Sequence, residues 1–324
     1  MAGAFFTKPE TSVEREDFYE RLKARGAGPL WQELADLVMA QPRPACVPAL
    51  WRYEEMRPYL MEAGGIITAE EAERRVLMLE NPGLKGLPQI TQSLYAGLQL
   101  VLPGEVTATH RHVASALRFV IEGNGAYTSV NGVRVTMHPG DFILTPSWTY
   151  HDHGNPTGEP VVWLDGLDIP IVNTFDSSFA EHYPDGTQAV VQNGDGSAVG
   201  FPYSRTRARL EAMTKNGPPD AHHGYRMHYG GQCTMPTIDA WLGLLPAGFR
   251  TAGYRSTDAT IFCVAEGRGK SSIGEKTFEW EAHDVFVAPS WMKVEHEAEG
   301  DAVLFSFSDR PIQKAAGIWR EEKK

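Results

Sequence analysis

The sequence contains few cysteines, and their spacing forms no pattern. Cys46, Cys233 and Cys263 lie far apart, they are odd in number, and no Cys-x-x-Cys pair occurs. Widely separated cysteines argue against a disulfide framework and are typical of proteins kept in a reducing compartment. We therefore expect a cytoplasmic protein without structural disulfides.

Long apolar runs and basic runs are also missing. No stretch approaches the roughly 18 apolar residues that a membrane-spanning helix needs. The first residues, MAGAFFTKPETSVERED, lack the basic stretch and apolar core that mark a secretory signal. Acidic residues number 41 against 30 lysines and arginines, so the net charge is −11. An acidic chain repels phosphate backbones, so we expect neither a membrane nor a nucleic acid as a partner.

The composition permits a substantial core, because 42% of the 324 residues are hydrophobic. The first part of the chain has helical periodicity, with apolar residues at helical spacing in 14–25 and 29–39. Thr68, followed by two glutamates, resembles a helix start, and the Asn-Pro-Gly sequence at 81–83 is expected to end that helix. We expect residues 1–87 to form a helical arm.

Short alternating strands separated by Gly and Pro turns begin near residue 89. The strands expected first are 94–102, 116–121, 126–130, 142–145 and 161–164. A second strand-rich block follows a region rich in Gly, Pro, Asp and Asn. The expected division after the arm is therefore a strand block at 88–175, an irregular connecting segment at 176–235, a second strand block at 236–310 and a tail at 311–324.

The two strand blocks resemble each other. Residues 121–148 read IEGNGAYTSVNGVRVTMHPGDFILTPSW, and residues 265–291 read AEGRGKSSIGEKTFEWEAHDVFVAPSW. Both contain Glu-Gly-x-Gly, then an aspartate before an apolar strand, then Pro-Ser-Trp, and their spacing differs by one residue. A match over such a span indicates a duplicated all-β unit.

Three histidines of the first block are spaced like metal ligands. His110 and His112 point to the same face of a strand, and His151 on a later strand can meet them across a barrel. Three neutral imidazoles suit Fe, Zn, Cu or Ni. The second block has Tyr254, Ser256 and Val294 at the corresponding positions, and these cannot form a metal triad. We expect one metal per chain and a second barrel that serves as a scaffold.

The spacing also resembles the two cupin motifs, as Gly104-x5-His110-x-His112 and Gly140-x5-Pro146-x4-His151-x3-Asn155. This resemblance implies an all-β core of two cupin barrels, small double-sheet jelly rolls, joined to the helical arm. Cupins usually add a carboxylate ligand shortly after the His-x-His pair, but Ala116 and Leu117 stand there. The site therefore leaves the charge of the metal for an anionic, chelating ligand.

A longer resemblance is more specific. The stretches HRHVASALRFVIEGNGAYTSVNGVRVTMHPGDFILTPSWTYHDHGN, VVWLDGLDIP and FSFSDRPIQKA, with residues 74–77 and 81–84, resemble the gentisate 1,2-dioxygenase family, which includes salicylate and 1-hydroxy-2-naphthoate dioxygenases. The resemblance implies a homotetrameric Fe(II) enzyme that uses O2 to cleave an aromatic 2-hydroxy acid, with gentisate giving maleylpyruvate. Salicylate, 5-substituted salicylates and 1-hydroxy-2-naphthoate remain alternative substrates. A non-catalytic bicupin that binds a small acid and a sugar-phosphate isomerase are alternatives of other classes.

The family resemblance also implies roles for residues near the histidine triad. His153 corresponds to a non-ligand histidine that acts in proton transfer or oxygen binding, and Asp165 is expected to orient it, with Asp168 as a rival. Arg118 can offer a bidentate fork to a carboxylate. Tyr95 resembles the gentisate-type enzymes and favours gentisate over salicylate. The residues implied to bind substrate are Tyr95, Gln99, Arg118 and either Arg74 or Arg75.

Overall fold

The computed structural model describes residues 6–193, 199–230 and 235–323. The chain divides into two compact units, Met1–Pro44 and Ala45–Lys324. The first unit holds two helices, α1 (Val13–Lys23) and α2 (Leu30–Leu37), which confirms the helical periodicity. The Ser12 side chain caps α1, yet neither helix has a buried residue.

The second unit opens with β1 (Ala49–Trp51), α3 (Tyr53–Ile66), α4 (Ala69–Ala72) and β2 (Val76–Met78). The helix start at Thr68 is confirmed by a capping box with Glu71. The expected end at 81–83 was wrong, because Glu73 takes a positive φ of 54° and the chain leaves the helix there. Residues 1–87 therefore contain two short strands besides their helices. No helix in the described part of the chain is long and apolar enough to cross a membrane.

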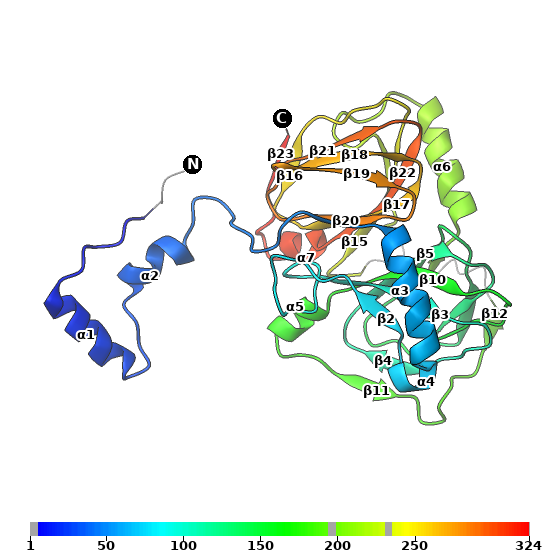
Figure 1. Ribbon diagram of the computed structural model, residues 1–324, viewed down its shortest axis with the longest axis horizontal. Helices are drawn as coiled ribbons and strands as arrows, with labels where there is room; N and C mark the ends of the chain where they lie inside the picture. The colour runs from blue at the N-terminus through cyan, green and yellow to red at the C-terminus, as the bar shows by residue number, and fades with distance from the viewer. Residues whose placement is uncertain (1–5, 194–198, 231–234, 324) are drawn as a thin grey trace. The chain divides into compact units, whose positions relative to one another are not determined.

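Four sheets form two barrels in the second unit (Figure 1). Barrel one has sheets ordered β13-β8-β5-β10-β3-β2 and β11-β4-β9-β6-β7-β12. Its strands are β3 (Tyr95–Val101), β4 (His110–His112), β5 (Ala116–Glu122), β6 (Tyr127–Val130), β7 (Val133–Thr136), β8 (Phe142–Thr145), β9 (His151–Gly154), β10 (Val161–Leu167), β11 (Ala180–His182), β12 (Gln192–Asn193) and β13 (Gly200–Phe201). The five strands expected first all form.

Barrel two has sheets ordered β1-β20-β17-β22-β15-β14 and β19-β18-β21-β16-β23. Its strands are β14 (Tyr225–His228), β15 (Asp239–Leu245), β16 (Tyr254–Ser256), β17 (Thr260–Glu266), β18 (Arg268–Ile273), β19 (Lys276–Glu281), β20 (Val285–Ala288), β21 (Val294–Ala298), β22 (Ala302–Ser308) and β23 (Glu321–Lys323). Equivalent strands follow the same order as in barrel one, so the topology agrees with the duplication inferred from sequence.

The repeat extends further upstream than the sequence match. Each copy of the repeat begins with a strand and a helix. These are β1 and α3 ahead of barrel one, and β13 and α6 (Tyr203–Lys215) ahead of barrel two. Each of these first strands joins the edge of the other copy's barrel. The backbone N–H of Tyr53 donates to Asp284 at 2.9 Å, and that of Tyr203 donates to Asp141 at 2.7 Å. The two barrels therefore exchange edge strands and are joined reciprocally.

Three apolar clusters account for the core. The largest lies between the two sheets that face each other across the barrels, where the rings of Phe119 and Phe305 stack 4.3 Å apart. The other two fill the barrel interiors, around Trp163 in barrel one and Trp280 in barrel two. Because the central sheets are buried on both faces, their strands read as nearly continuous apolar runs.

The segment 176–235 is more regular than its composition suggests, because it holds the 13-residue helix α6 as well as β11 and β14. Residues 194–198 and 231–234 of this segment lie outside the described residues. The short helices α5 (Ile169–Thr174) and α7 (Arg310–Ala315) follow the last long strand of each barrel. The tail belongs to barrel two, since β23 pairs with β16.

Candidate metal centre

The three histidines expected to bind a metal converge in barrel one. His110 and His112 lie on β4, and His110 stands opposite His151 of β9 in the strand register. One ring nitrogen from each histidine lies within 4.8 Å of the others. Strand alternation, which puts His110 and His112 on one face, therefore produces a cluster able to hold one metal ion.

Backbone carbonyls fix the rings of two of these histidines. Nδ1 of His112 lies 2.7 Å from the Ala114 carbonyl oxygen, and Nδ1 of His151 lies 3.0 Å from the Thr149 carbonyl oxygen. A carbonyl oxygen only accepts, so each Nδ1 carries the proton and each Nε2 keeps its lone pair. Such contacts set the tautomer of metal-ligating histidines, so both rings fit a metal bound through Nε2.

Burial keeps the triad neutral. It lowers the pKa of His110 to about 3, with the nearby Arg74 charge adding to the effect. Burial also lowers the pKa of His112, and it lowers the pKa of His151 well below the usual range. Neutral imidazole is the form that ligates metals, so the triad is ready to bind at neutral pH.

Arg74 reaches the triad from the segment before β2. Its Nη2 lies 2.8 Å from Nδ1 of His110 and donates to the Ala108 carbonyl at 3.1 Å. A guanidinium has no acceptor, so Nδ1 of His110 accepts in this contact. The neighbouring Arg75 instead forms a buried ion pair with Glu105 at 2.8 Å. Of the two arginines considered from sequence, only Arg74 contacts the site.

Arg118 and Asp165 form a buried ion pair next to the triad. They stand opposite each other on β5 and β10, with Nε of Arg118 3.5 Å from Oδ1 of Asp165. Arg118 also donates to Thr145 Oγ1 at 2.6 Å, and Trp163 Nε1 donates to Asp165 at 3.0 Å. Burial raises the pKa of Asp165 to about 6, although the Arg118 charge opposes this shift. Nε of Arg118 has no hydrogen-bond partner in the described structure.

His153 is fully buried on β9, on the same strand face as His151. Its Nδ1 pairs with Thr128 Oγ1 at 2.9 Å, while Nε2 is buried without a partner among the described residues. Burial lowers the pKa of His153 well below the usual range, and the charge of Arg118 adds to this effect. His153 therefore offers one unsatisfied ring nitrogen in the barrel.

The expectation that Asp165 or Asp168 orients His153 does not agree with these contacts. Asp165 is occupied by Arg118 and Trp163. Asp168 accepts from the Ser115 N–H at 2.8 Å and from the Thr237 hydroxyl, so it ties barrel one to the segment that enters barrel two. Thr128 is the residue that holds the His153 ring.

Tyr95 and Gln99 lie on β3 with the same orientation, and Gln99 is buried. Burial raises the pKa of the Tyr95 hydroxyl, and the charge of Asp165 raises it further. Gly97 stands between them. A Cβ there would lie 3.0 Å from the Tyr95 hydroxyl and 2.5 Å from Val76 Cγ1. Glycine thus gives the Tyr95 side chain room to lie along the strand.

Barrel two preserves the frame of the site but not its ligands. Tyr254 stands opposite Val294 in the register, as His110 stands opposite His151. His296 pairs with Ser271 at 2.7 Å, as His153 pairs with Thr128. The described residues contain one cluster of potential metal ligands, and it is the triad of barrel one.

Sequence reasoning missed Thr128, Thr145 and Trp163, which hold His153, Arg118 and Asp165 respectively. Each lies on a strand that was expected, so strand alternation offered a signal for facing the barrel interior. Neutral hydroxyl and indole groups are common in strands, however, and nothing in the sequence separates these from packing residues.

Comparison with known proteins agrees with this site. The model of the Cupin domain family matches residues 97–167, which include the triad and its neighbours. A gentisate 1,2-dioxygenase from Aquipseudomonas alcaligenes is 51% identical over 99% of both chains. A 5-aminosalicylate 1,2-dioxygenase from Comamonas is 34% identical over 96% of this chain and 90% of its own.

Solved structures agree with the fold over its whole length. A variant of salicylate 1,2-dioxygenase from Pseudoaminobacter salicylatoxidans, in complex with gentisate, has a TM-score of 0.92 at 30% identity and covers 100% of this chain and 98% of its own. The similarity to the Aquipseudomonas relative over 99% of both chains, together with the histidine triad, shows that this chain belongs to the gentisate 1,2-dioxygenase family of ring-cleaving dioxygenases.

Proposed function

We propose that the chain binds one Fe(II) through His110, His112 and His151 and uses O2 to cleave gentisate to maleylpyruvate. The observation that carries the proposal is the triad together with two buried atoms that make no hydrogen bond among the described residues, Nε2 of His153 and Nε of Arg118. Buried polar atoms without partners cost stability, and a bound ligand removes that cost. Relatives named gentisate 1,2-dioxygenase, the first 51% identical, support the choice of substrate.

The ligand set fits Fe(II) and a chelating acid. Three neutral imidazoles bring no negative charge, so the metal keeps its charge for the carboxylate and phenolate of the substrate. Bound Fe(II) supplies electron transfer between the ring and O2. Coordination of His110 through Nε2 requires a proton on Nδ1, which removes the acceptor that Arg74 uses. The Arg74 guanidinium, still held by the Ala108 carbonyl, could then donate to the substrate carboxylate.

Two residues beside the triad have chemical roles in this proposal. Arg118 is positioned by Asp165 and Thr145, and its Nε, which makes no hydrogen bond among the described residues, would donate to an anionic oxygen of the substrate. His153 is held at Nδ1 by Thr128, so its Nε2 can accept or deliver a proton. Asp165 acts by keeping the Arg118 fork in place.

Tyr95 and Gln99 line the substrate side of the pocket in this proposal. Gentisate carries a second hydroxyl para to its chelating one, and the hydroxyl of the half-buried Tyr95 can meet a polar substrate group. A site that hydrogen-bonds a hydroxyl discriminates strongly against an analogue lacking it. We therefore expect gentisate to be preferred over salicylate by kcat/KM, with substituted salicylates next.

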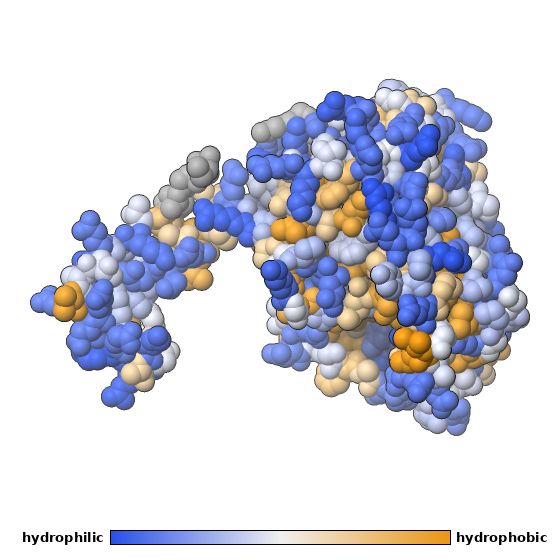
Figure 2. Space-filling view, in the orientation of Figure 1, coloured by the Kyte–Doolittle hydropathy of each residue, from blue (hydrophilic) through white to orange (hydrophobic). Residues whose placement is uncertain are grey.

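The chain acts as a homo-oligomer in this proposal, and we expect a tetramer, as the sequence resemblance implies. Within the first unit, α2 exposes Leu30, Trp31 and Leu37 at 58%, 48% and 66%, and neither helix has a core of its own. Figure 2 shows a further apolar patch where α3 ends, and there Ile66 is 78% exposed. Apolar surfaces of this kind mark protein contacts. Sedimentation should give a mass near four chains, and a monomer would contradict the assembly.

Metal content tests the ligand assignment. The wild type, loaded with iron under anaerobic conditions, should retain about one iron per chain, and His112→Ala should retain little while remaining folded. His182, an exposed histidine opposite His110 on β11, offers a matched control. His182→Ala should keep its iron. An active His112→Ala protein with full iron content would overturn the triad.

Oxygen uptake tests the substrate. Gentisate, salicylate, 5-substituted salicylates and 1-hydroxy-2-naphthoate are compared at identical iron loading, with Tyr95→Phe beside the wild type. We expect gentisate to be best and Tyr95→Phe to narrow its advantage over salicylate. If none of the four acids supports oxygen uptake, the chain is a non-catalytic protein that binds a small acid. If gentisate is the poorest substrate, the chain belongs with the salicylate-type enzymes.

A further inference from the structure

Barrel two contains a cavity, whereas a barrel that served only as a scaffold would be filled by packed side chains. The cavity has a volume of about 60 Å³ and lies among β14–β17, β20–β22 and α7. Its lining includes Tyr254, Ser256 and Val294, the residues at the positions of the triad. None of the triad residues lines it. The loss of metal ligands has therefore left an open site at the place equivalent to the metal centre.

The charged groups of this cavity are not those of barrel one. Phe262 and Ser306 stand opposite each other in the register, as Arg118 and Asp165 do in barrel one. That ion pair has no counterpart here, and arginines of three other elements line the cavity; one of them, Arg255 of β16, is already paired with Glu322. Arg226 comes from β14 and Arg310 from α7, and both line the cavity.

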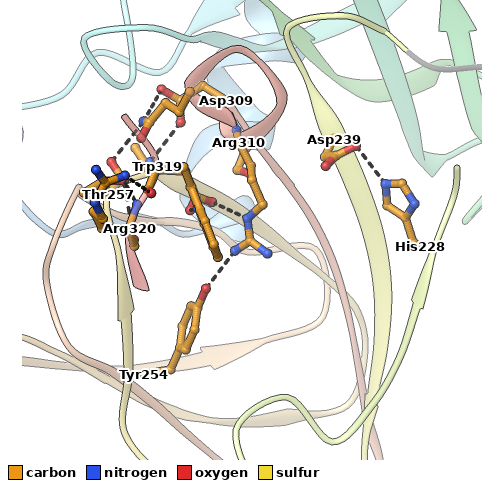
Figure 3. A network of polar contacts seen from close by, with 12 residues as sticks. His228, Asp239, Tyr254, Thr257, Asp309, Arg310, Trp319 and Arg320 are labelled. Carbon is orange, nitrogen blue, oxygen red and sulfur yellow. Dashed lines mark hydrogen bonds and ion pairs between the residues drawn. The ribbon is translucent and has the colours of Figure 1, made fainter. Parts of the chain in front are cut away.

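The two guanidiniums have one close carboxylate between them. Arg310 pairs with the buried Asp258 at 3.2 Å and donates to the Tyr254 hydroxyl at 3.0 Å, as Figure 3 shows for the second contact. Arg226 lies over the Trp241 ring at 4.2 Å, and no described carboxylate forms an ion pair with it. Burial lowers the pKa of Arg226 to about 10, with Arg310 adding repulsion, yet it stays charged at neutral pH.

We propose that this cavity of barrel two is a second, metal-independent binding site for a small aromatic carboxylate, with Arg226 as its main anion-binding group. Arg226 contacts the His223 ring at 3.4 Å and forms no close ion pair with a described carboxylate. A guanidinium in this situation favours an anion, and its planar fork matches a carboxylate. Phe262, Met292 and Leu304 supply an apolar wall for a ring. Tyr254, held by Arg310, offers a further polar contact.

The volume of the cavity indicates the size of ligand that it can hold. About 10–15 Å³ on this measure holds one water, so the cavity takes roughly five waters, or about 150 Å³ of liquid, a volume that accommodates a benzene ring. A single-ring acid therefore matches the volume of the cavity. Partly exposed His222 and Met292 line the cavity and provide an opening to solvent.

The test is binding of 4-fluorobenzoate to the full-length, iron-loaded protein, followed by fluorine NMR. Arg226→Leu should weaken the barrel-two binding component about 10- to 100-fold, the range for a lost charged hydrogen bond. The exposed Arg268, paired with Glu299, is the matched control, and Arg268→Leu should bind as the wild type does. Gentisate turnover reports that each variant is folded, because neither arginine contacts the triad.

A variant expected to gain affinity separates binding from structural damage. Asp258→Asn removes the charge that occupies Arg310 and keeps an oxygen to accept from Trp319 Nε1, which lies 2.7 Å away. It should bind 4-fluorobenzoate more tightly than the wild type. Unchanged binding in Arg226→Leu, weaker binding in Asp258→Asn, or displacement by inorganic phosphate at equal concentration would each overturn the proposal.

Discussion

Replacing Arg118 and replacing Asp165, the two partners of a buried ion pair, should cost different amounts of stability. Both side chains are buried, and their charges lie 3.5 Å apart. Breaking a buried ion pair by removing one partner costs about 3–5 kcal/mol when the remaining charge has no compensation. The two partners differ in whether the survivor can neutralise itself, so the two single substitutions should differ in cost.

Asp165→Asn leaves a guanidinium that stays protonated, so the full cost of about 3–5 kcal/mol is expected. Arg118→Met leaves a carboxyl whose pKa is already about 6 in the presence of Arg118. Without that charge its pKa rises further, so Asp165 takes up a proton at neutral pH. The expected cost of Arg118→Met is about 1–2 kcal/mol, because each unit between pH and pKa is worth about 1.4 kcal/mol.

The double variant Arg118→Met, Asp165→Asn removes both charges and should be more stable than Asp165→Asn alone. Urea unfolding of the metal-free proteins at pH 7 gives the free energies. Relative to the wild type, Arg118→Met should also recover stability as pH falls from 7 towards 6, because its folded state already binds a proton that the wild-type Asp165, with a pKa of about 6, does not yet bind.

Activity gives an independent readout of the same cycle. Arg118→Met and the double variant should keep iron but lose roughly 10²–10³-fold in kcat, as expected for a lost electrostatic contact to the reacting groups. Equal destabilisation by the two single variants, with additive costs in the double variant, would refute the reasoning. Such additivity would mean that the two side chains have no interaction energy with each other.

Two further predictions concern the strands that hold the triad. Gly154→Ala should destabilise the protein by about 1–3 kcal/mol through overpacking, because a Cβ there would lie 2.4 Å from the Tyr127 hydroxyl; Gly158→Ala, with nothing within 4 Å, should be nearly neutral in the same urea assay. The metal-free protein should lose stability as pH falls below about 6.5, because the unfolded state protonates His110 whereas the native pKa is about 3. His110→Gln should recover about 2 kcal/mol of that loss between pH 6.5 and 5, and an unchanged pH profile in this variant would contradict a neutral, buried His110.

The parts of the fold that follow from local patterns could be predicted from the sequence. Alternating residues gave the strands of barrel one, and the parity of His110 and His112 placed both on one face. The repeated Gly and Pro-Ser-Trp positions indicated two related barrels. These patterns involve residues close together in the sequence, so they can be recognised without knowing which distant segments are in contact.

The rest depends on contacts between distant segments. Nothing local indicates that β1 joins the edge of barrel two or that β13 joins barrel one. The partner of Asp165 was misjudged because a buried carboxylate can pair with any donor that faces it. Here the strand register puts Arg118 there. Helix α6 was missed because its 13 residues bury only Thr206 and Leu210 and show weak periodicity.

The duplication explains how one barrel keeps a metal site while the other loses it. Most of the apolar core lies between the barrels and at their exchanged edges, where both copies must keep the same frame. The polar interiors contribute less to that frame, so their side chains can change independently. Barrel one has three histidines and, beside them, two buried nitrogens that make no hydrogen bond among the described residues. Barrel two has Arg226 and Arg310 beside a cavity at the equivalent place. Apolar residues that fill such a space would stabilise the barrel more, so the charges and the cavity support a ligand site in barrel two.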